Sequence, residues 1–324
     1  MPPMIRVENL VKRFGRTTAL DGAGFAAEAG TVVGVLGPNG AGKTTVVRIL
    51  ATLLRPDRGL VRVGGLDVTR EPARVRALLG LTGQYAAVDG DLTGAENLVL
   101  FGRLLGLPRP AARDRAAELL ERFELGAVAA RPASAYSGGL CRRLDLAASL
   151  IGRPRVLCLD EPTTGLDPHV RRELWQVVRE LVADGVTVLL TTQYLEEADR
   201  LADRVTVFDA GRVVADGTPE ELKRRVGGCT VQVRPALARD VDATARVLGG
   251  LTGTTPARDA GTGLLTAPAA DPMVLSTLVR ELDRAGLAVT ELGLRRPSLD
   301  EVFLALTGKP AGAAVPAARE GSAG

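Results

Sequence analysis

Short apolar runs alternate with segments of helical periodicity along most of the chain. Three runs rich in Val and Leu have the length of buried strands: residues 31–36, 156–160 and 186–190. Three further segments have the length and spacing of helices: residues 45–54, 170–183 and 194–202. With residues 204–208 as a last strand, this alternation predicts a mostly parallel sheet covered by helices on both faces.

Two stretches depart from this alternation. Residues 4–28 alternate loosely between apolar and polar positions, and with the hairpin-like stretch 59–68 they predict an antiparallel β layer. Residues 92–130 have a helical pattern, so we expect a helical insert over about 92–150. Its apolar face is predicted to consist of Leu98, Leu100, Leu104, Leu105, Leu119, Leu120 and Phe123.

A second, smaller region follows the Gly227-Gly228 pair. Strands are predicted at 229–235, 263–267 and 287–294, with a weak one at 253–258, and helices are predicted near 240–249 and 271–285. The resulting order β-α-β-β-α-β predicts a small α+β domain of the ferredoxin-like type.

The end of this region contains a helix and a polar tail. The helix starts at Ser298, with Glu301 completing a capping box. Its apolar face, which contains Val302 and Phe303, packs either on its own domain or on a partner subunit. Residues 309–324 are rich in Ala, Gly and Pro and are expected to be disordered.

The composition narrows the class of protein. The chain has 324 residues, enough for two domains, and its net charge of +3 provides no basic field for nucleic acid. Cys141, Cys158 and Cys229 lack the spacing of a disulfide framework or a metal site, which favours reduced cysteines in a cytosolic protein. No apolar run approaches the roughly 18–20 residues that span a bilayer, and no signal peptide is expected.

A glycine-rich segment, GPNGAGKTT, stands between the first buried strand and the first helix. It fits the phosphate-binding pattern G-x-x-x-x-G-K-[ST], and its glycines let successive N–H groups point at one anion. Lys43 supplies a full charge for the β- and γ-phosphates, and the Thr44 hydroxyl suits Mg²⁺. We therefore predict a nucleoside triphosphate site formed by Gly37, Pro38, Asn39, Gly40, Ala41, Gly42, Lys43, Thr44 and Thr45.

Two acidic residues, Asp160 and Glu161, stand at the carboxyl end of the buried run 156–160. Asp160 is its last residue and Glu161 follows. An acid at the carboxyl end of a parallel strand beside a phosphate loop is well placed to hold the Mg²⁺ shell. Glu161 would then orient or deprotonate the water that attacks the γ-phosphate. The alternative is that both acids are surface charges.

Each of three other features is consistent with two interpretations. The Phe14 ring either stacks on a base or packs under a hairpin. Ser137-Gly138-Gly139 is either a second anion-binding geometry or an ordinary helix start with Ser137 as N-cap. Gln193 follows a buried strand, where its amide either reaches the γ-phosphate or caps the next helix.

Together these segments resemble the ATP-binding cassette (ABC) ATPases, the motor subunits of ABC transporters. The resemblance spans residues 4 to about 225. It rests on features in family order: the phosphate loop at 37–45, Gln84, the SGG at 137–139, the Asp160-Glu161 pair and Asp167 in a GLDP turn. It implies an α/β fold of the P-loop NTPase type, with an ABC ATPase domain over 1–226 and an accessory domain over 227–308.

The resemblance also implies roles and partners. ATP and Mg²⁺ are the implied cofactors, with Thr44, Gln84 and Asp160 near the metal. Glu161 and Gln193 are the implied catalytic residues. In a head-to-tail homodimer, Ser137, Gly138 and Gly139 of one chain would face the ATP held by its mate. Phe14 would stack on the adenine, and Gln84 and Asp167 would also contact the nucleotide.

Some positions differ from the usual family pattern, and other segments indicate which branch of the family the chain resembles. Leu140 stands where Gln is usual, and Gln193 stands where His is usual; His169, the one His, is expected at the surface. The segments TTQYLEEAD, YSGG and PSLDEVFLALTG are similar to the daunorubicin-type drug-resistance branch. There the permease is a separate polypeptide, so we expect a peripheral protein at the cytoplasmic face of the cell membrane that drives efflux of a hydrophobic drug or antibiotic.

Two other functions fit the sequence less well than transport does. A non-transport ABC ATPase of translation or DNA repair usually carries two cassettes or long coiled coils, whereas this chain has a single phosphate loop. A small-molecule kinase of the P-loop type would leave the SGG and GLDP segments unexplained.

Overall fold

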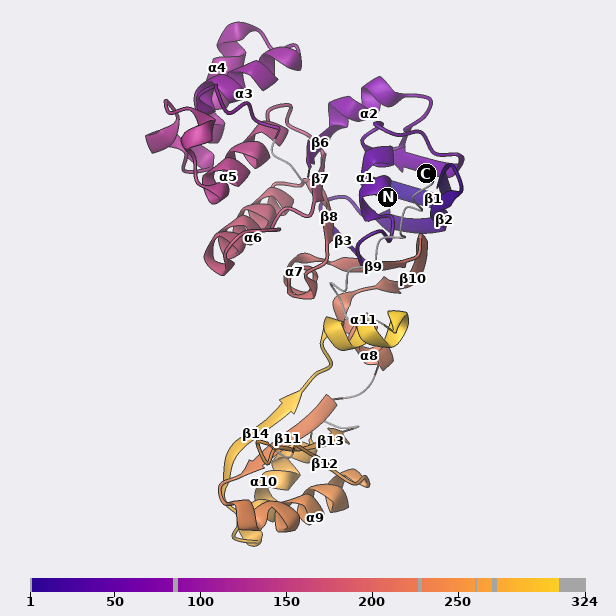
Figure 1. Ribbon diagram of the computed structural model, residues 1–324, viewed down its shortest axis with the longest axis vertical. Coiled ribbons are helices and arrows are strands. Elements are labelled where there is room, and N and C mark those ends of the chain that lie inside the picture. Colours follow the sequence, from indigo (N-terminus) through magenta and orange to yellow (C-terminus); the bar gives the residue numbers. More distant parts are fainter. Residues whose placement is uncertain (1, 84–86, 227–228, 260, 270–272, 309–324) are drawn as a thin grey trace, which may run out of the picture. The chain divides into compact units, whose positions relative to one another are not determined.

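The computed structural model describes residues 2–83, 87–226, 229–259, 261–269 and 273–308 (Figure 1). Two compact units are present: one is built mainly from the residues up to Pro219, and the other spans Glu220–Ala305. None of the described helices is long and apolar enough to cross a membrane.

A six-stranded sheet forms the centre of the first unit. Its strands are, in spatial order, β10 (Arg212–Gly217), β9 (Arg204–Asp209), β3 (Val32–Leu36), β8 (Thr187–Thr192), β7 (Val156–Asp160) and β6 (Leu79–Thr82). All neighbours pair in parallel except β10, which is antiparallel to β9. The mostly parallel sheet expected from the sequence is confirmed.

The expectation that residues 204–208 form the last strand is wrong, because β10 follows directly. The two strands are joined by Ala210 and Gly211, whose φ angles are 46° and 80°. Two successive residues with positive φ make the tight turn that suits antiparallel strands. Ala is a weak sequence signal for such a turn, since Gly, Asn and Asp adopt positive φ more readily.

Helices connect these strands: α1 (Lys43–Leu50), α2 (Pro72–Leu78), α6 (Pro168–Ala183) and α7 (Leu195–Leu201). The helix expected over 45–54 is α1, which begins at Lys43 and ends at Leu50, before the expected positions at both ends. Gly42, with a φ of 104°, leads the chain into the first turn at Lys43. Thr52, with a φ of 60°, breaks the helical path soon after Leu50.

An antiparallel layer covers one side of this sheet. It consists of β2 (Thr17–Ala27), β1 (Ile5–Phe14), β4 (Arg58–Val63) and β5 (Leu66–Asp67), in that spatial order. Ile5 and Leu10 of the layer share one buried core with Val46 of α1 and Val35 of β3. The position of α1, and so of the loop before it, is therefore fixed from two sides.

The helical insert contains α3 (Gly94–Leu104), α4 (Arg109–Arg122) and α5 (Gly138–Ser149). Its expected apolar face is only partly correct: Leu98, Leu119, Leu120 and Phe123 are buried, whereas Leu100, Leu104 and Leu105 are exposed. A Cβ built on Gly102 would lie 2.9 Å from the Ala112 Cβ, so small residues hold α3 close to α4. Leu100 lines the open groove between these two helices, which leaves it exposed.

The second unit contains an antiparallel sheet with two helices. Its elements are β11 (Cys229–Pro235), α9 (Val241–Thr252), β12 (Ala257–Arg258), β13 (Leu265–Ala269), α10 (Val274–Arg284) and β14 (Val289–Arg295), and the sheet order is β12-β13-β11-β14. Val231 and Val233 share a core with Leu278. We propose that residues 227–308, most of which belong to this unit, are a ferredoxin-like accessory domain, and that residues 1–226 are the ATPase domain.

Two more helices are α8 (Pro219–Val226) and α11 (Leu299–Thr307). Ser298 and Glu301 form the expected capping box: the Ser298 N–H donates to Glu301 Oε2 at 3.0 Å, and the Glu301 N–H donates to Ser298 Oγ at 3.3 Å. Val302 and Phe303 are buried within the single chain, while Leu306 remains exposed. The predicted tail 309–324 lies outside the described residues.

Candidate nucleotide site

The glycine-rich loop between β3 and α1 requires its glycines. A Cβ on Gly37 would lie 2.6 Å from the Phe208 carbonyl oxygen, and one on Gly42 would lie 2.6 Å from the Ala19 carbonyl oxygen. Gly40, at the exposed tip beside Asn39, has a φ of 81°. The loop therefore follows a path that residues with side chains adopt only with strain, and it leads into the N-terminus of α1.

Lys43 is buried in this loop and directs its charge inward. Its ammonium group donates to the carbonyl oxygens of Gly37 at 2.8 Å and Pro38 at 3.2 Å. It also lies 3.4 Å from Glu161 Oε1. Burial lowers the pKa of Lys43 from its usual value, and the negative charges of Glu161 and Asp160 oppose this shift.

Asp160, the last residue of β7, is hydrogen-bonded to two hydroxyl groups. Its Oδ1 accepts from the Thr191 hydroxyl at 2.6 Å and from the Thr44 hydroxyl at 3.2 Å. Its side chain is buried, so the interpretation as a surface charge is wrong for this residue. The carboxylate and the Thr44 hydroxyl present oxygen atoms at one place, beside the first turn of α1.

Glu161 has an unusual backbone conformation at the end of β7. Its φ is 51°, in the left-handed region that non-glycine residues avoid. Its N–H donates to the carbonyl oxygen and to the hydroxyl of Thr191, at 3.0 and 3.1 Å. This conformation places the Glu161 carboxylate within 3.4 Å of the Lys43 ammonium group.

Gln193 follows β8 at the same edge of the sheet. In the strand register, Asp160 is paired with Thr191 and Leu36 with Thr192, so the carboxyl ends of β7, β8 and β3 lie side by side. The N-cap of α7 is Tyr194, and no side chain caps that helix. The interpretation of Gln193 as a helix cap is therefore wrong.

The SGG segment lies at the start of α5, in the helical insert. The Ser137 hydroxyl accepts from the Leu140 N–H at 3.4 Å, as expected for the N-cap. Nothing lies within 4 Å of a Cβ built on Gly138, while one on Gly139 would lie 3.0 Å from Val170. Within the described residues, no hydrogen bond joins this segment to the loop 37–45.

Asp167 and His169 begin α6. Asp167 is the N-cap, and its Oδ1 accepts from the N–H groups of His169 at 2.9 Å and Val170 at 3.0 Å. The His169 side chain is 75% exposed and lies 3.2 Å from Glu173, so it is at the surface as expected.

Phe14 ends β1 with half of its ring open to solvent. Its exposure of 50% rules out packing beneath the hairpin. The Lys12 ammonium lies 5.5 Å from the ring centroid and is held by Asp57, which also accepts from the Arg13 N–H at 2.6 Å. Gln84, which was expected near the nucleotide, lies outside the described residues.

Thr191, Arg142 and Asp145 were not expected from the sequence to belong to the site. Thr191 belongs to an apolar run and looks like an ordinary strand residue. Arg142 and Asp145 are buried charges of α5; Arg142 bonds to backbone groups that follow β6 and β7, and Asp145 bonds to the Ala87 N–H. The sequence does contain a signal for this pair, because Arg142 and Asp145 stand three residues apart among the apolar positions of one helix.

Comparison with known proteins places this geometry in one class. A family model for ABC transporters matches residues 20–164, and a model for the C-terminal domain of DrrA1-3-like ATP-binding proteins matches residues 217–307. A solved ATP-binding cassette, dimeric, in a post-hydrolysis state and bound to ADP and Pi, is similar at a TM-score of 0.61 and 26% identity, covering 66% of this chain and 98% of that one. The chain therefore belongs to the ATP-binding subunits of ABC transporters and is an ATPase.

Two curated relatives define the branch. The chain is 56% identical over 305 residues to the daunorubicin resistance ATP-binding protein DrrA3 of Streptomyces coeruleorubidus, covering 94% of this chain and 96% of the relative. It is 41% identical over 308 residues to the Nod factor export ATP-binding protein I of Ralstonia nicotianae, covering 95% and 94%. Within its class the chain belongs with the daunorubicin-resistance ATP-binding proteins, and the resemblance inferred from its motifs is confirmed.

Thr191 provides the first test of this geometry. Thr191→Val removes the hydroxyl that Asp160 and the Glu161 N–H share, so the free energy of unfolding should fall by about 1.5–3 kcal/mol. Thr191→Ser keeps the hydroxyl and loses only a methyl group, at a cost of about 0.8 kcal/mol. Denaturant unfolding of both variants measures the difference. A Val variant as stable as the parent chain would contradict the role given to the hydroxyl.

Proposed function

We propose that this chain hydrolyses ATP to drive a separate membrane permease that exports a hydrophobic drug or antibiotic. The observation that carries the proposal is the convergence of Lys43, Asp160 and Glu161 at one edge of the parallel sheet. The names of the relatives, which refer to daunorubicin resistance and to Nod factor export, support the direction of transport. The chain would act at the cytoplasmic face of the membrane as a peripheral subunit.

The loop 37–45 binds the triphosphate in this proposal. Its backbone N–H groups and the N-terminus of α1 provide partial positive charge, and Lys43 adds a full one. The ammonium group is held by loop carbonyls and by Glu161. A γ-phosphate near Lys43 would compete with the Glu161 carboxylate for the ammonium group, which would free Glu161 to accept a proton from water.

Thr44 and Asp160 fit a magnesium ion. Their oxygen atoms lie 3.2 Å apart, and hydroxyl and carboxylate oxygens are ligands that Mg²⁺ prefers. The described residues contain no cluster of three or more His, Cys, Asp or Glu that could hold a metal. Mg²⁺ is commonly bound by one or two protein groups together with phosphates and water, and here it would neutralise charge on those phosphates. Gln84 is proposed as a further ligand.

Glu161 is the proposed general base. Its carboxylate would take a proton from the water that attacks the γ-phosphorus, as the bond between the γ-phosphorus and the β–γ bridging oxygen breaks. Gln193 would orient this water and the γ-phosphate by hydrogen bonds alone, because an amide does not titrate near neutral pH. Phe14, whose ring is half exposed, would stack on the adenine.

A second copy of the chain would complete the site. In our proposal Ser137, Gly138 and Gly139 face the nucleotide of the partner, because they stand at the N-terminus of α5, where partial positive charge suits a phosphate. The similar cassette solved as a dimer supports the association of two copies. Asp167 would act near the same junction mainly by capping α6, since its Oδ1 already accepts from His169 and Val170.

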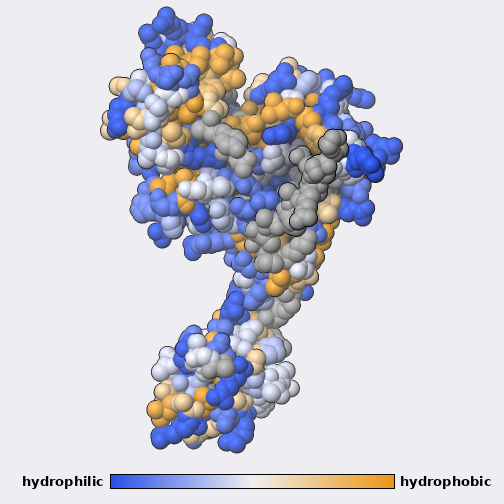
Figure 2. All heavy atoms as spheres, viewed as in Figure 1, coloured by the Kyte–Doolittle hydropathy of each residue, from blue (hydrophilic) through white to orange (hydrophobic). Residues whose placement is uncertain are grey.

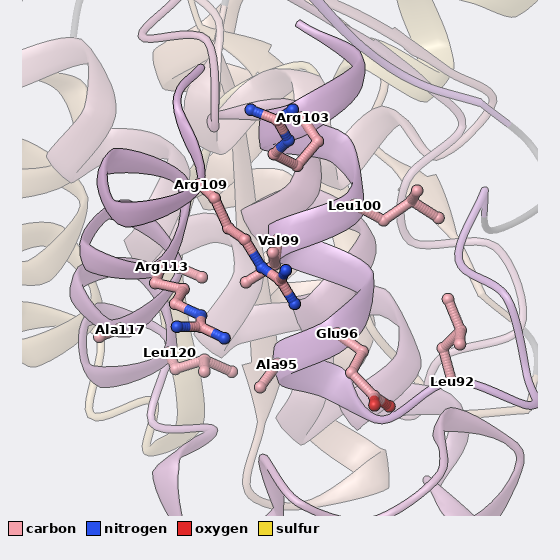
Figure 3. Close-up of a pocket in the computed structure, with 11 residues that line it drawn as sticks. Leu92, Ala95, Glu96, Val99, Leu100, Arg103, Arg109, Arg113, Ala117 and Leu120 are labelled. Carbon is pink, nitrogen blue, oxygen red and sulfur yellow. The ribbon is translucent and has the colours of Figure 1, made fainter. Parts of the chain in front are cut away.

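An exposed groove between α3 and α4 is the proposed contact for the permease. It encloses about 800 Å³ and is lined by Leu92, Ala95, Glu96, Val99, Leu100, Arg103, Arg109, Arg113, Ala116, Ala117 and Leu120. Arg109 and Arg113 extend their side chains from the α4 side toward α3 (Figure 3). Hydrophobic surface also gathers on the helical insert (Figure 2). These features suit an apolar segment with acidic residues.

Glu161→Gln tests the hydrolytic role. The amide cannot accept a proton at neutral pH, so turnover should fall by about 10²–10⁴-fold. ATP binding should persist, and the bound chains should accumulate as dimers. Phosphate release, fluorescent nucleotide titration and size-exclusion chromatography measure these effects, with the exposed Glu196→Gln as the matched control. Hydrolysis by Glu161→Gln at the parental rate would remove Glu161 from the role of base.

Leu100→Glu tests the groove. A carboxylate there would oppose an apolar, acidic segment, so co-purification with the permease and transport should fall by about tenfold or more. Basal ATPase activity of the isolated chain should be unchanged. Leu104→Glu is the control, because Leu104 belongs to the same helix and is 73% exposed but does not line the groove. Equal association of both variants with the permease would exclude the groove as its contact.

A further inference from the structure

Helix α5 carries two buried charges, Arg142 and Asp145, whose removal from water is costly. Arg142 and Asp145 are 9% and 3% exposed, and Arg142 Nη1 lies 3.4 Å from Asp145 Oδ2. Burial lowers the pKa of Arg142 and raises the pKa of Asp145, although each residue's charge opposes the shift of the other. Both shifts disfavour the charged form, as expected when desolvation outweighs the attraction between partners.

The Arg142 guanidinium group connects two neighbouring strand ends. Its Nε donates to the Pro162 carbonyl oxygen at 2.8 Å, and Nη1 donates to the Gly83 carbonyl oxygen at 2.8 Å. Nη2 lies 3.4 Å from the carbonyl oxygen of Glu161. Gly83 follows β6 and Glu161 follows β7, and these two strands are paired in the central sheet. One side chain of α5 thus bonds to backbone groups that follow two strands.

Asp145 completes this arrangement from the next turn of α5. Its Oδ1 accepts from the Ala87 N–H at 2.8 Å, while Oδ2 lies 3.4 Å from Arg142. The backbone groups of Gly83 and Ala87 are therefore both hydrogen-bonded to this pair. A helix of the insert is tied to the core by charged hydrogen bonds, which are stronger and more directional than apolar contacts.

Arg142 contacts the backbone of Glu161 and Pro162, which sets the orientation of the Glu161 side chain. Glu161 has a φ of 51°, a conformation that costs free energy and persists only when its surroundings enforce it. The Thr191 carbonyl oxygen and hydroxyl hold its N–H, and Arg142 lies against its carbonyl oxygen. The same helix that carries Arg142 begins next to Ser137.

We propose that Arg142 and Asp145 are positioning residues for ATP hydrolysis. Arg142 fixes the backbone of Glu161 and Pro162 to α5, and Asp145 holds both Arg142 and the Ala87 N–H. The Glu161 carboxylate and the Ser137 end of the helix therefore keep a defined relation within one chain. This inference rests on the proposed role of Glu161 as the base. Arg142 and Asp145 act through backbone groups, and in the described part of the chain they make no hydrogen bond with the loop 37–45.

Arg142→Lys in the full-length chain tests the inference. Lysine keeps the charge, but its single ammonium group cannot reproduce the planar fork that spans the two strand ends. We expect kcat to fall by about ten- to a hundredfold, while the KM and the binding of a fluorescent ATP analogue change by no more than about twofold. Asp145→Asn keeps an oxygen acceptor for the Ala87 N–H and should lower kcat less than Arg142→Lys does.

Arg143→Lys is the matched control, since Arg143 is the next residue of α5 and bonds to the side chains of Glu124 and Glu173 instead. Its kcat should be unchanged. Parental kcat in Arg142→Lys, or equal losses of kcat, nucleotide affinity and melting temperature, would overturn the inference. If Arg142→Lys does not fold, Asp145→Asn decides by the same measurements. An inactive parental chain would instead contradict the proposed function.

Discussion

The buried ammonium group of Lys43 is the constraint on which the rest of the site depends. A cation removed from water is costly unless polar partners surround it, and here the loop carbonyls and Glu161 provide them. The loop brings its carbonyl groups inward because Gly37 and Gly42 pass close to other backbone segments. Glu161 reaches Lys43 from β7 through a left-handed backbone turn. A bound phosphate would offer the same cation an alternative partner.

Strand register brings these groups together. The strands β7, β8 and β3 end side by side, and Thr191 of the middle strand bonds to both residues that end and follow β7. On the other side, Arg142 of α5 bonds to the backbone that follows Glu161. The acidic pair is therefore held by the sheet and by the helical insert together.

Local signals made much of this fold predictable from the sequence. The phosphate loop, the strand that ends at Asp160 and the capping box at Ser298 each depend on residues within a few positions of one another. Long-range contacts were not predictable in this way. The exposure of Leu100 depends on how closely α3 approaches α4, and the partners of Arg142 are carbonyl groups distant in sequence, which carry no side-chain signal.

The most direct measurement concerns the shared site. A chain with Lys43→Ala lacks the charge proposed to bind phosphate. A chain with Ser137→Arg carries a bulky side chain in the segment proposed to face its mate. Each variant should therefore be inactive alone. A heterodimer of the two retains one intact site in our account. ATPase activity should therefore reappear when the two variants are mixed. Activity that stays at background in the mixture, with both variants folded and dimer-competent, would contradict a site shared between chains.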